Sequence, residues 1–308
     1  MTHDGAAATG RDLSRPFGRL LTAMITPFTP DGGLDLDGAA QLATYLVDEQ
    51  GNDALVVNGT TGESPTTTDA EKERLVRAVV EAVGDRARVV AGVGTNDTRH
   101  TIELATAAEK AGADGLLVVS PYYNKPPQTG LVRHFTAVAD ASGLPVMLYD
   151  IPHRAGVAIA TETLVRLAEH ERIVAVKDAK GDLTATSWVT SRTDLAFYSG
   201  DDALTVPTLA IGGVGLVGTS THFTGALAKR MIEAYDRGDV GAALALHRRL
   251  LPLFTGIFRT QGTILVKAAL AASGLPAGPV RPPLVDATDD ELAQLRIDCA
   301  EAGLGLPA

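Results

Sequence analysis

Eight short apolar runs recur along the chain, separated by segments with helical periodicity. The runs are continuous rather than alternating, which is typical of strands buried on both faces of a parallel sheet. The predicted strands are residues 20–25, 54–57, 88–92, 115–119, 145–149, 173–177, 195–199 and 214–218.

The segments between these strands have the start signals and apolar stripes of amphipathic helices. After the second strand, Thr68 and Glu71 have the spacing of a capping box, and Leu75, Val76 and Val79 lie on one helical face. An alternation of strand and helix with about eight strands predicts an α/β fold, the (β/α)₈ TIM barrel. A doubly wound open sheet is the alternative, because periodicity alone does not exclude it.

The strand signal stops near Ala234, and the remaining chain has the pattern of helices. Helices are predicted at 240–254 and 262–273, and a last one follows the capping box that begins at Thr288. We therefore divide the chain into three parts: a disordered N-terminal tail at 1–16, a (β/α)₈ barrel at 17–233 and a C-terminal helical extension at 234–308.

The amino-acid composition is that of a globular protein without intramolecular disulfides. Of 308 residues, 45% are apolar and 21% charged, as in a globular protein with a large core. Cys299 is the only cysteine, so no intramolecular disulfide can form, which fits a reducing compartment. Acidic residues outnumber basic ones by 37 to 27, and without a basic run we expect no nucleic-acid partner. With neither a signal peptide nor a membrane-spanning run in sight, we expect a cytoplasmic protein without membrane association.

Two strand ends carry polar residues suited to a carboxylate and to proton transfer. Thr60 and Thr61 follow the second strand in a Gly-Thr-Thr-Gly turn, and their hydroxyl and N–H groups could hold a carboxylate. On its own, such a turn is more often purely structural. Tyr149 ends the fifth strand and could relay a proton, while Arg154 could grip a carboxylate. Equally good explanations are that Tyr149 is an ordinary aromatic residue at a strand end and that Arg154 forms a surface ion pair.

Lys177 ends the apolar sixth strand. Lysine is costly to bury, and desolvation lowers its pKa, which frees an amine able to form an imine with a ketone. The alternative to a catalytic role is an ordinary lysine whose ammonium group extends into solvent. We assign that alternative to Lys180.

Four motifs together indicate a family. They are Gly-Thr-Thr-Gly-Glu-Ser at 59–64, Pro-Tyr-Tyr at 121–123, Tyr-Asp-Ile-Pro-His-Arg at 149–154 and Val-Lys-Asp at 176–178. In the order and spacing of these motifs, the chain from about Phe17 onward resembles the dihydrodipicolinate synthase/N-acetylneuraminate lyase family. The amino-acid sequence within the motifs is most similar to that of actinobacterial dihydrodipicolinate synthases.

The resemblance implies a lyase that condenses pyruvate with L-aspartate 4-semialdehyde in lysine and diaminopimelate biosynthesis. Lys177 would form the Schiff base with pyruvate, and Thr61 would hold the pyruvate carboxylate. Thr60, Tyr149 and Tyr123 would form a proton relay, in which Tyr123 reaches into the neighbouring subunit's site. The family therefore implies a homo-oligomer, a tetramer built from two tight dimers.

Three further positions match family residues. Arg154 would bind the carboxylate of the semialdehyde, and the backbones of Gly200 and Val217 would line the pyruvate pocket. Neither a metal nor an organic cofactor is expected. Lysine-inhibited relatives carry different residues at the positions of Asp69, Lys72 and His100. The resemblance thus implies weak or absent feedback by lysine.

Three other functions remain open at this stage. Another pyruvate-dependent member, such as a 2-keto-3-deoxy sugar acid aldolase or N-acetylneuraminate lyase, would share Lys177 and Tyr149, whereas Arg154 favours a short carboxylated aldehyde. A non-catalytic pyruvate-binding barrel would be expected to have lost such residues. The Gly-x-Gly-x-x-Gly pattern at 213–218 would suit a nicotinamide enzyme, but it lies within the last predicted strand and Glu233 lies on a helix.

Overall fold

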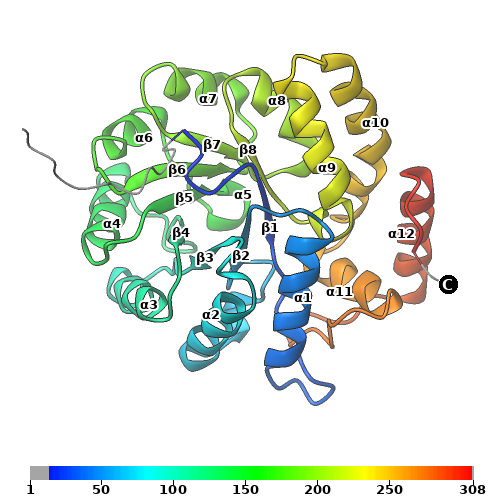
Figure 1. The fold of residues 1–308 in the computed structure, drawn as a ribbon. Helices are drawn as coiled ribbons and strands as arrows, with labels where there is room; N and C mark the ends of the chain where they lie inside the picture. The colour runs from blue at the N-terminus through cyan, green and yellow to red at the C-terminus, as the bar shows by residue number, and fades with distance from the viewer. Residues whose placement is uncertain (1–13, 307–308) are drawn as a thin grey trace, which may run out of the picture.

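The computed structural model describes residues 14–306, in which eight parallel strands close into a barrel (Figure 1). The expected (β/α)₈ fold is confirmed, and the strands follow one another around the barrel in chain order. The strands are β1 Leu20–Ala23, β2 Ala54–Val57, β3 Arg88–Gly92, β4 Gly115–Val119, β5 Val146–Asp150, β6 Ile173–Asp178, β7 Ala196–Ser199 and β8 Gly215–Gly218. Of the tail expected at 1–16, residues 1–13 lie outside the described part.

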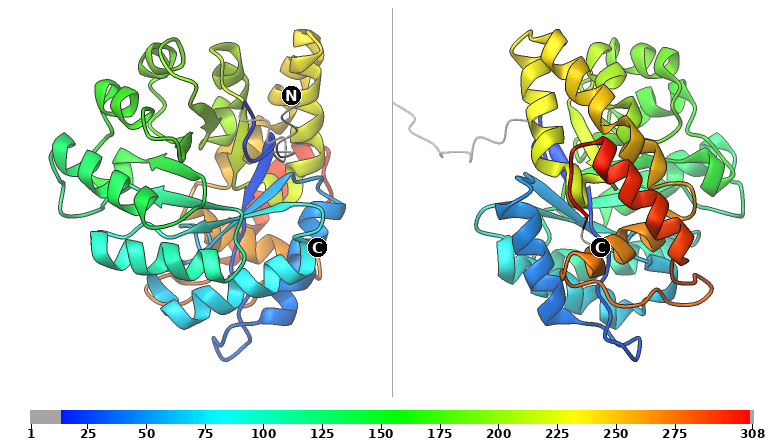
Figure 2. Two further views of the ribbon diagram at one scale, coloured as in Figure 1. Left: turned by 60° about the vertical axis from the view of Figure 1, so that its left-hand side comes forward. Right: turned by 90° about the vertical axis from the view of Figure 1, so that its right-hand side faces the viewer.

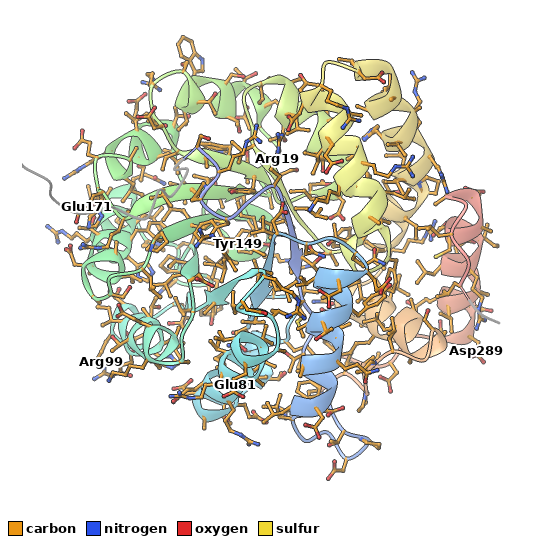
Figure 3. All side chains as sticks on the ribbon, in the orientation of Figure 1. Arg19, Glu81, Arg99, Tyr149, Glu171 and Asp289 are labelled. Carbon is orange, nitrogen blue, oxygen red and sulfur yellow. The ribbon has the colours of Figure 1, made fainter. Side chains whose placement is uncertain are left out.

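The strands are apolar throughout because both of their faces are buried. In β2, Ala54 and Val56 belong to the cluster that fills the barrel, whereas Leu55 and Val57 pack outward against the helices. This arrangement explains why the runs do not alternate with polar residues. Figure 3 shows the complementary surface, where Glu81, Arg99 and Glu171 lie at the periphery of the molecule.

Helices surround the barrel and connect its strands. They are α1 Leu36–Asp48, α2 Asp69–Val83, α3 Thr98–Lys110, α4 Gln128–Asp140, α5 Pro152–Ala155, α6 Thr161–Leu167, α7 Leu183–Thr190, α8 Thr205–Ala210 and α9 Thr221–Asp236. The predicted capping box is present at the start of α2, where Thr68 and Glu71 satisfy each other's backbone N–H groups. No helix among residues 14–306 combines the length and apolar character needed to cross a bilayer.

Three further helices follow the barrel: α10 Val240–Gly256, α11 Gly262–Ala272 and α12 Asp289–Glu301. They gather along one side of the molecule (Figure 2, right). The boundary expected between 233 and 234 falls inside α9, which runs through Asp236. The start of α11 also contacts the barrel directly, since the Thr263 hydroxyl donates to the Thr61 carbonyl at 2.9 Å. This contact brings the extension to the edge where the strands end.

Candidate active site

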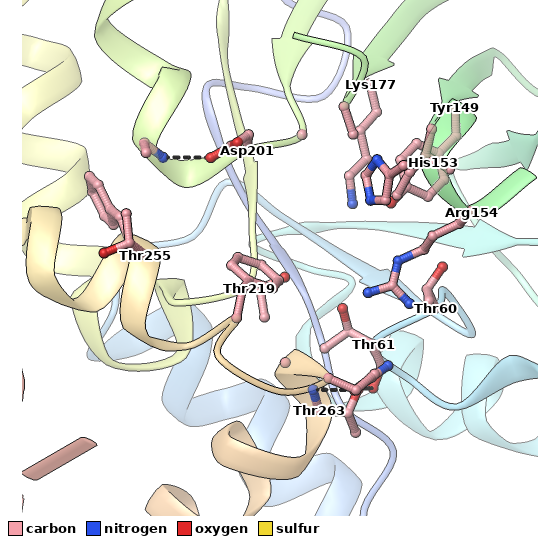
Figure 4. Close-up of a pocket in the computed structure, with 18 of the residues that line it drawn as sticks. Thr60, Thr61, Tyr149, His153, Arg154, Lys177, Asp201, Thr219, Thr255 and Thr263 are labelled. Atoms are coloured by element: carbon pink, nitrogen blue, oxygen red, sulfur yellow. Dashed lines mark hydrogen bonds between the residues drawn. The ribbon is translucent and has the colours of Figure 1, made fainter. Parts of the chain in front are cut away.

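The carboxyl ends of the strands surround a cavity of about 480 Å³. Catalytic sites of barrel enzymes are found at this end. Six of the eight residues singled out from the sequence line it: Thr60, Thr61, Tyr149, Arg154, Lys177 and Gly200. In Figure 4 the Lys177 and Arg154 side chains both point into the cavity, toward the two threonines.

Lys177 is buried at the end of β6, with 5% of its surface exposed. Tyr149 is its register partner on β5, so the two side chains point to the same side of the sheet. The Lys177 Nζ lies 4.4 Å from the centre of the Tyr149 ring. Burial lowers the pKa of Lys177 from 10.5 to about 8, although the charge of Asp202 opposes the change. A fraction of this amine is therefore neutral near physiological pH and can act as a nucleophile.

Tyr149 is the buried phenol of the cavity. Burial raises its pKa to about 12, while the positive charge of Arg154 and a hydrogen bond with Thr60 act in the opposite direction. The phenol therefore stays protonated at neutral pH. The Lys177 amine lies over its ring and its hydroxyl is hydrogen-bonded to Thr60, so a group able to donate or accept a proton is held beside the amine.

The turn after β2 presents Thr60 and Thr61 to the cavity. Two residues of this turn, Asn58 and Glu63, have positive φ angles of 58° and 56°, a conformation that few side chains adopt. Within the turn, the Glu63 N–H donates to the Thr60 carbonyl at 3.1 Å. The tight turn keeps both threonines close to the strand end, where their polar groups face Arg154.

The cationic groups of the cavity come from neighbouring elements. Arg154 lies on the short helix α5, directly after β5, and His153 beside it also lines the cavity. Arg154 and Lys177 together place positive charge opposite the hydroxyls of the threonine turn. Such a site suits ligands that carry a carboxylate.

Gly200 follows β7, where the end of β6 leaves little room for a side chain. A Cβ there would lie 3.0 Å from the Ala179 Cβ and 3.1 Å from the Asp178 carbonyl carbon. Val217, in contrast, is fully buried in the packed interior of the barrel, and the cavity wall does not include it.

Tyr123 stands apart from the cavity of its own chain. It is 88% exposed, and its φ of 72° is uncommon for an aromatic residue. A second cavity of about 380 Å³ adjoins the first and shares Thr60, Tyr149 and Arg154 with it. Tyr122, rather than Tyr123, lines this second cavity. The tyrosine–threonine contact can therefore be approached from two sides.

Sequence reasoning missed two parts of the site. Asp202 is a fully buried carboxylate that accepts hydrogen bonds from the Thr219 and Ser220 N–H groups, and it acts electrostatically on Lys177. It follows the end of β7, so the strand-end rule that selected Lys177 could also have found it. The outer wall of the cavity comes from the C-terminal extension and includes Phe254 and Phe258. No local signal marked these residues.

The closed barrel with a polar cavity at the carboxyl ends of its strands has the architecture of a (β/α)₈ barrel enzyme. The chain belongs to the dihydrodipicolinate synthetase family, whose model matches residues 16–302. It is 74% identical over 288 residues to a 4-hydroxy-tetrahydrodipicolinate synthase of Acidothermus cellulolyticus, covering 94% of this chain and 93% of that protein. It is 66% identical to 4-hydroxy-tetrahydrodipicolinate synthase 2 of Streptomyces coelicolor, covering 94% and 97%.

A solved structure agrees with these relatives. The dihydrodipicolinate synthase of Cyanidioschyzon merolae, crystallised with lysine bound, superimposes with a TM-score of 0.91 at 46% identity and covers 94% of this chain and 99% of that one. The predicted family is confirmed, and its similarity to actinobacterial synthases is confirmed as well.

Proposed function

We propose that the protein catalyses the 4-hydroxy-tetrahydrodipicolinate synthase reaction, the condensation of pyruvate with L-aspartate 4-semialdehyde. The observation that carries the proposal is the buried amine of Lys177, 4.4 Å from the Tyr149 ring in a cavity that also holds Arg154 and two threonine hydroxyls. The high identity to named synthases, over nearly the whole of each chain, supports the same reaction.

The chemistry begins at Lys177. Its neutral amine adds to the ketone of pyruvate, and loss of one water leaves an imine. The imine withdraws electrons from the neighbouring methyl group. Loss of a proton from that methyl group converts the imine into an enamine. The enamine carbon attacks the aldehyde, whose oxygen takes up a proton. The amino group of the same substrate then displaces Lys177 from the imine carbon, which closes the ring and releases the enzyme.

Every one of these steps moves a proton, and Tyr149 with Thr60 is placed to carry it. The Tyr149 phenol lies beside the reacting nitrogen, and its contact with Thr60 extends the path away from Lys177. Thr61 would hold the pyruvate carboxylate with groups of the same turn. Gly200 would line the pyruvate pocket with its backbone, and Val217 would contribute its backbone in the same way.

Tyr123 gives the proposal its oligomeric part. An aromatic side chain held outward by a positive φ is suited to reach another molecule. In a pair of chains, the partner's Tyr123 would enter the second cavity and meet Tyr149 and Thr60 there. The dimer would then be the smallest unit with a complete relay, and two such dimers would form the tetramer.

Arg154 separates this proposal from its nearest rival, an aldolase that acts on a sugar acid. Its guanidinium lies in the cavity next to Thr60 and can pair with the carboxylate of a short aldehyde. A polyol chain would instead need hydroxyl and amide partners along its length. Although the cavity also presents hydroxyl and amide groups such as Thr260 and Gln261, it is the Arg154 guanidinium that favours the semialdehyde.

The experiment that tests the proposal combines trapping with turnover. Pyruvate and borohydride should add one reduced pyruvyl group to Lys177, located by peptide mass spectrometry, and the coupled assay should show turnover of aspartate semialdehyde. An adduct without that turnover would move the assignment to a sugar-acid aldolase. A protein that forms no adduct would contradict the Schiff-base mechanism itself.

The rate of adduct formation is expected to rise with pH up to about 8 and then to level off. Only the neutral amine attacks pyruvate, and burial lowers the pKa of Lys177 to about 8. Below that value the rate should fall about tenfold for each pH unit, because the protonated fraction grows in that proportion. Quenching with borohydride at short times measures the rate. A midpoint near the ordinary lysine pKa of 10.5 would show that the amine is not desolvated.

L-Lysine at millimolar concentration is expected to leave the activity close to its uninhibited value. The carboxylate of Asp69 is already engaged by His100, 2.9 Å away, and the buried ammonium group of Lys72 adds positive charge nearby. A cationic ligand would therefore find few free anionic partners at these positions. Initial rates with and without lysine, at subsaturating pyruvate, provide the measurement. Strong inhibition would contradict this prediction.

A further inference from the structure

A buried ion pair connects the threonine turn to the C-terminal extension. The Lys267 Nζ, on α11, lies 2.6 Å from the Glu63 Oε1, and their side chains are only 3% and 1% exposed. Removing two charges from water is costly, and a well-packed apolar pair is often at least as stable. Stability alone is therefore a weak explanation for an ion pair at this place.

Glu63 belongs to the turn that carries Thr60 and Thr61. Its backbone is left-handed, with φ of 56°, and surrounding contacts must hold such a conformation in place. Its second carboxylate oxygen, Oε2, accepts a hydrogen bond from the backbone N–H of Arg281 at 2.8 Å. Both oxygens of the carboxylate are thus bound by the part of the chain that follows the barrel.

The cationic side of the pair is equally constrained. Lys267 also donates to the Pro279 carbonyl at 2.8 Å, and its Nζ lies over the Phe28 ring, 4.0 Å from the centre. The Arg281 guanidinium lies over the same ring at the same distance. These contacts leave the ammonium group of Lys267 little freedom to move away from Glu63.

A second bond links the same two segments. The Thr263 hydroxyl, at the start of α11, donates to the Thr61 carbonyl at 2.9 Å. One residue of the turn is therefore held through its backbone and another, Glu63, through its side chain, and both partners lie on one helix. The ion pair and the hydrogen bond together fix the orientation of the turn as well as its distance from α11.

We propose that Glu63 and Lys267 are positioning residues, through which the C-terminal extension holds the turn in the conformation that receives the carboxylate of a 2-oxo acid. The inference rests on the proposed function for the identity of that ligand. Neither residue lines the cavity, so both act through Thr60 and Thr61. The extension is then part of the binding machinery rather than a separate appendage.

Two variants test the role of the pair. Lys267→Met removes the cation and leaves the Glu63 carboxylate buried without its partner. The double variant Glu63→Gln/Lys267→Met removes both charges, so it keeps the experiment decisive if the single variant does not fold. The glutamine side chain of the double variant retains an oxygen that can accept the Arg281 N–H.

Lys229→Met is the control at another lysine–carboxylate pair. The Lys229 Nζ also joins a carboxylate and a carbonyl, Asp53 Oδ1 at 2.9 Å and Gly51 O at 2.8 Å. Asp53 directly precedes β2, so this pair lies at the opposite end of the barrel from the threonine turn. The side chains of the control pair are 36% and 30% exposed, so the control removes a more exposed lysine–carboxylate contact at a place where it cannot position the turn.

Two readouts separate positioning of the turn from binding of the ligand. Hydrogen exchange on the protein without ligand follows the amides of Glu63, Ser64 and Thr66, which are bonded within the turn. Borohydride trapping over a range of pyruvate concentrations gives the half-saturating concentration and the rate at saturation. We expect faster exchange in the turn with unchanged exchange in β6. The half-saturating concentration should rise on the order of tenfold, with the saturated rate within about threefold of the wild type.

The results can overturn each part of the inference separately. Unchanged exchange in the turn would show that the pair does not hold it, and a loosened turn with unchanged half-saturation would show that its order does not matter for the ligand. Equal effects in Lys229→Met would reduce the result to general destabilisation. A wild-type protein that forms no adduct would remove the proposed function alone, and the exchange data would still decide whether the pair positions the turn.

Discussion

Replacement of Lys177 by methionine is expected to abolish the reducible pyruvyl adduct and to lower turnover on the order of 10⁴-fold or more. Methionine keeps the length of the side chain but has no amine, so the packing against Tyr149 is largely retained. Without an imine the pyruvate methyl group is not activated, and binding alone cannot replace this covalent step.

The same variant should be more stable than the wild type, by an amount that is largest below about pH 8 and declines above it. Folding lowers the pKa of Lys177 from 10.5 to about 8, so the folded chain binds this proton less tightly than the unfolded chain does. At neutral pH the shift corresponds to a destabilisation of roughly 3 kcal/mol, which disappears as the pH approaches the unfolded value. Loss of activity with a gain in stability would show that the buried amine is kept for chemistry.

Peptide mass spectrometry and urea unfolding at pH 7 check these two results. Lys180 is the internal control, because it lies three residues further along and pairs with Asp150 at 3.3 Å outside the cavity wall. In the wild type the adduct should therefore be on Lys177 and not on Lys180. An adduct that persists in Lys177→Met would place the Schiff base on another lysine and contradict the mechanism.

Tyr149→Phe is expected to lower kcat by about 10² to 10⁴, the usual contribution of a positioned acid–base group. The phenyl ring still fills the space beside Lys177, but the hydroxyl that contacts Thr60 is lost. Proton transfers to and from the imine, the enamine and the new alkoxide would then depend on water. The adduct should still form on Lys177, though more slowly, because the amine itself is intact.

Tyr198→Phe provides the control for this second prediction. Tyr198 is also buried in the barrel interior, and its hydroxyl donates to the Gly18 carbonyl at 2.9 Å, away from the cavity. Its loss should cost about 1 kcal/mol of stability with little change in kcat. Steady-state kinetics and thermal unfolding of both variants make the comparison. If the two tyrosines proved equally dispensable for kcat, the proton relay would have to be reassigned.

The barrel could be predicted because its determinants are local. The apolar runs predicted all eight strands to within two residues at either end, since a strand buried on both faces must be apolar throughout. The capping boxes at Thr68 and Thr288 predicted the starts of α2 and α12, because the bonds that define them lie within four residues. Strand order followed from the regular alternation of strand and helix.

Much of the candidate site could be predicted for a related reason. In a closed parallel barrel every strand ends at the same edge, so polar residues far apart in the sequence meet there. Thr60, Tyr149 and Lys177 were selected by this rule, and the structure places them in one cavity. Their roles in catalysis remain predictions.

The remaining features depend on contacts between distant segments. The sequence determined which residues end strands, but only the tertiary structure decided that Val217 is packed inside the barrel and that Tyr123 points outward. It also turned α11 back onto the threonine turn, so that Lys267 meets Glu63 although most of the barrel separates them along the chain. Neither helical periodicity nor a turn motif specifies such a pairing, because its energy comes from burial and charge that exist only after the barrel has closed.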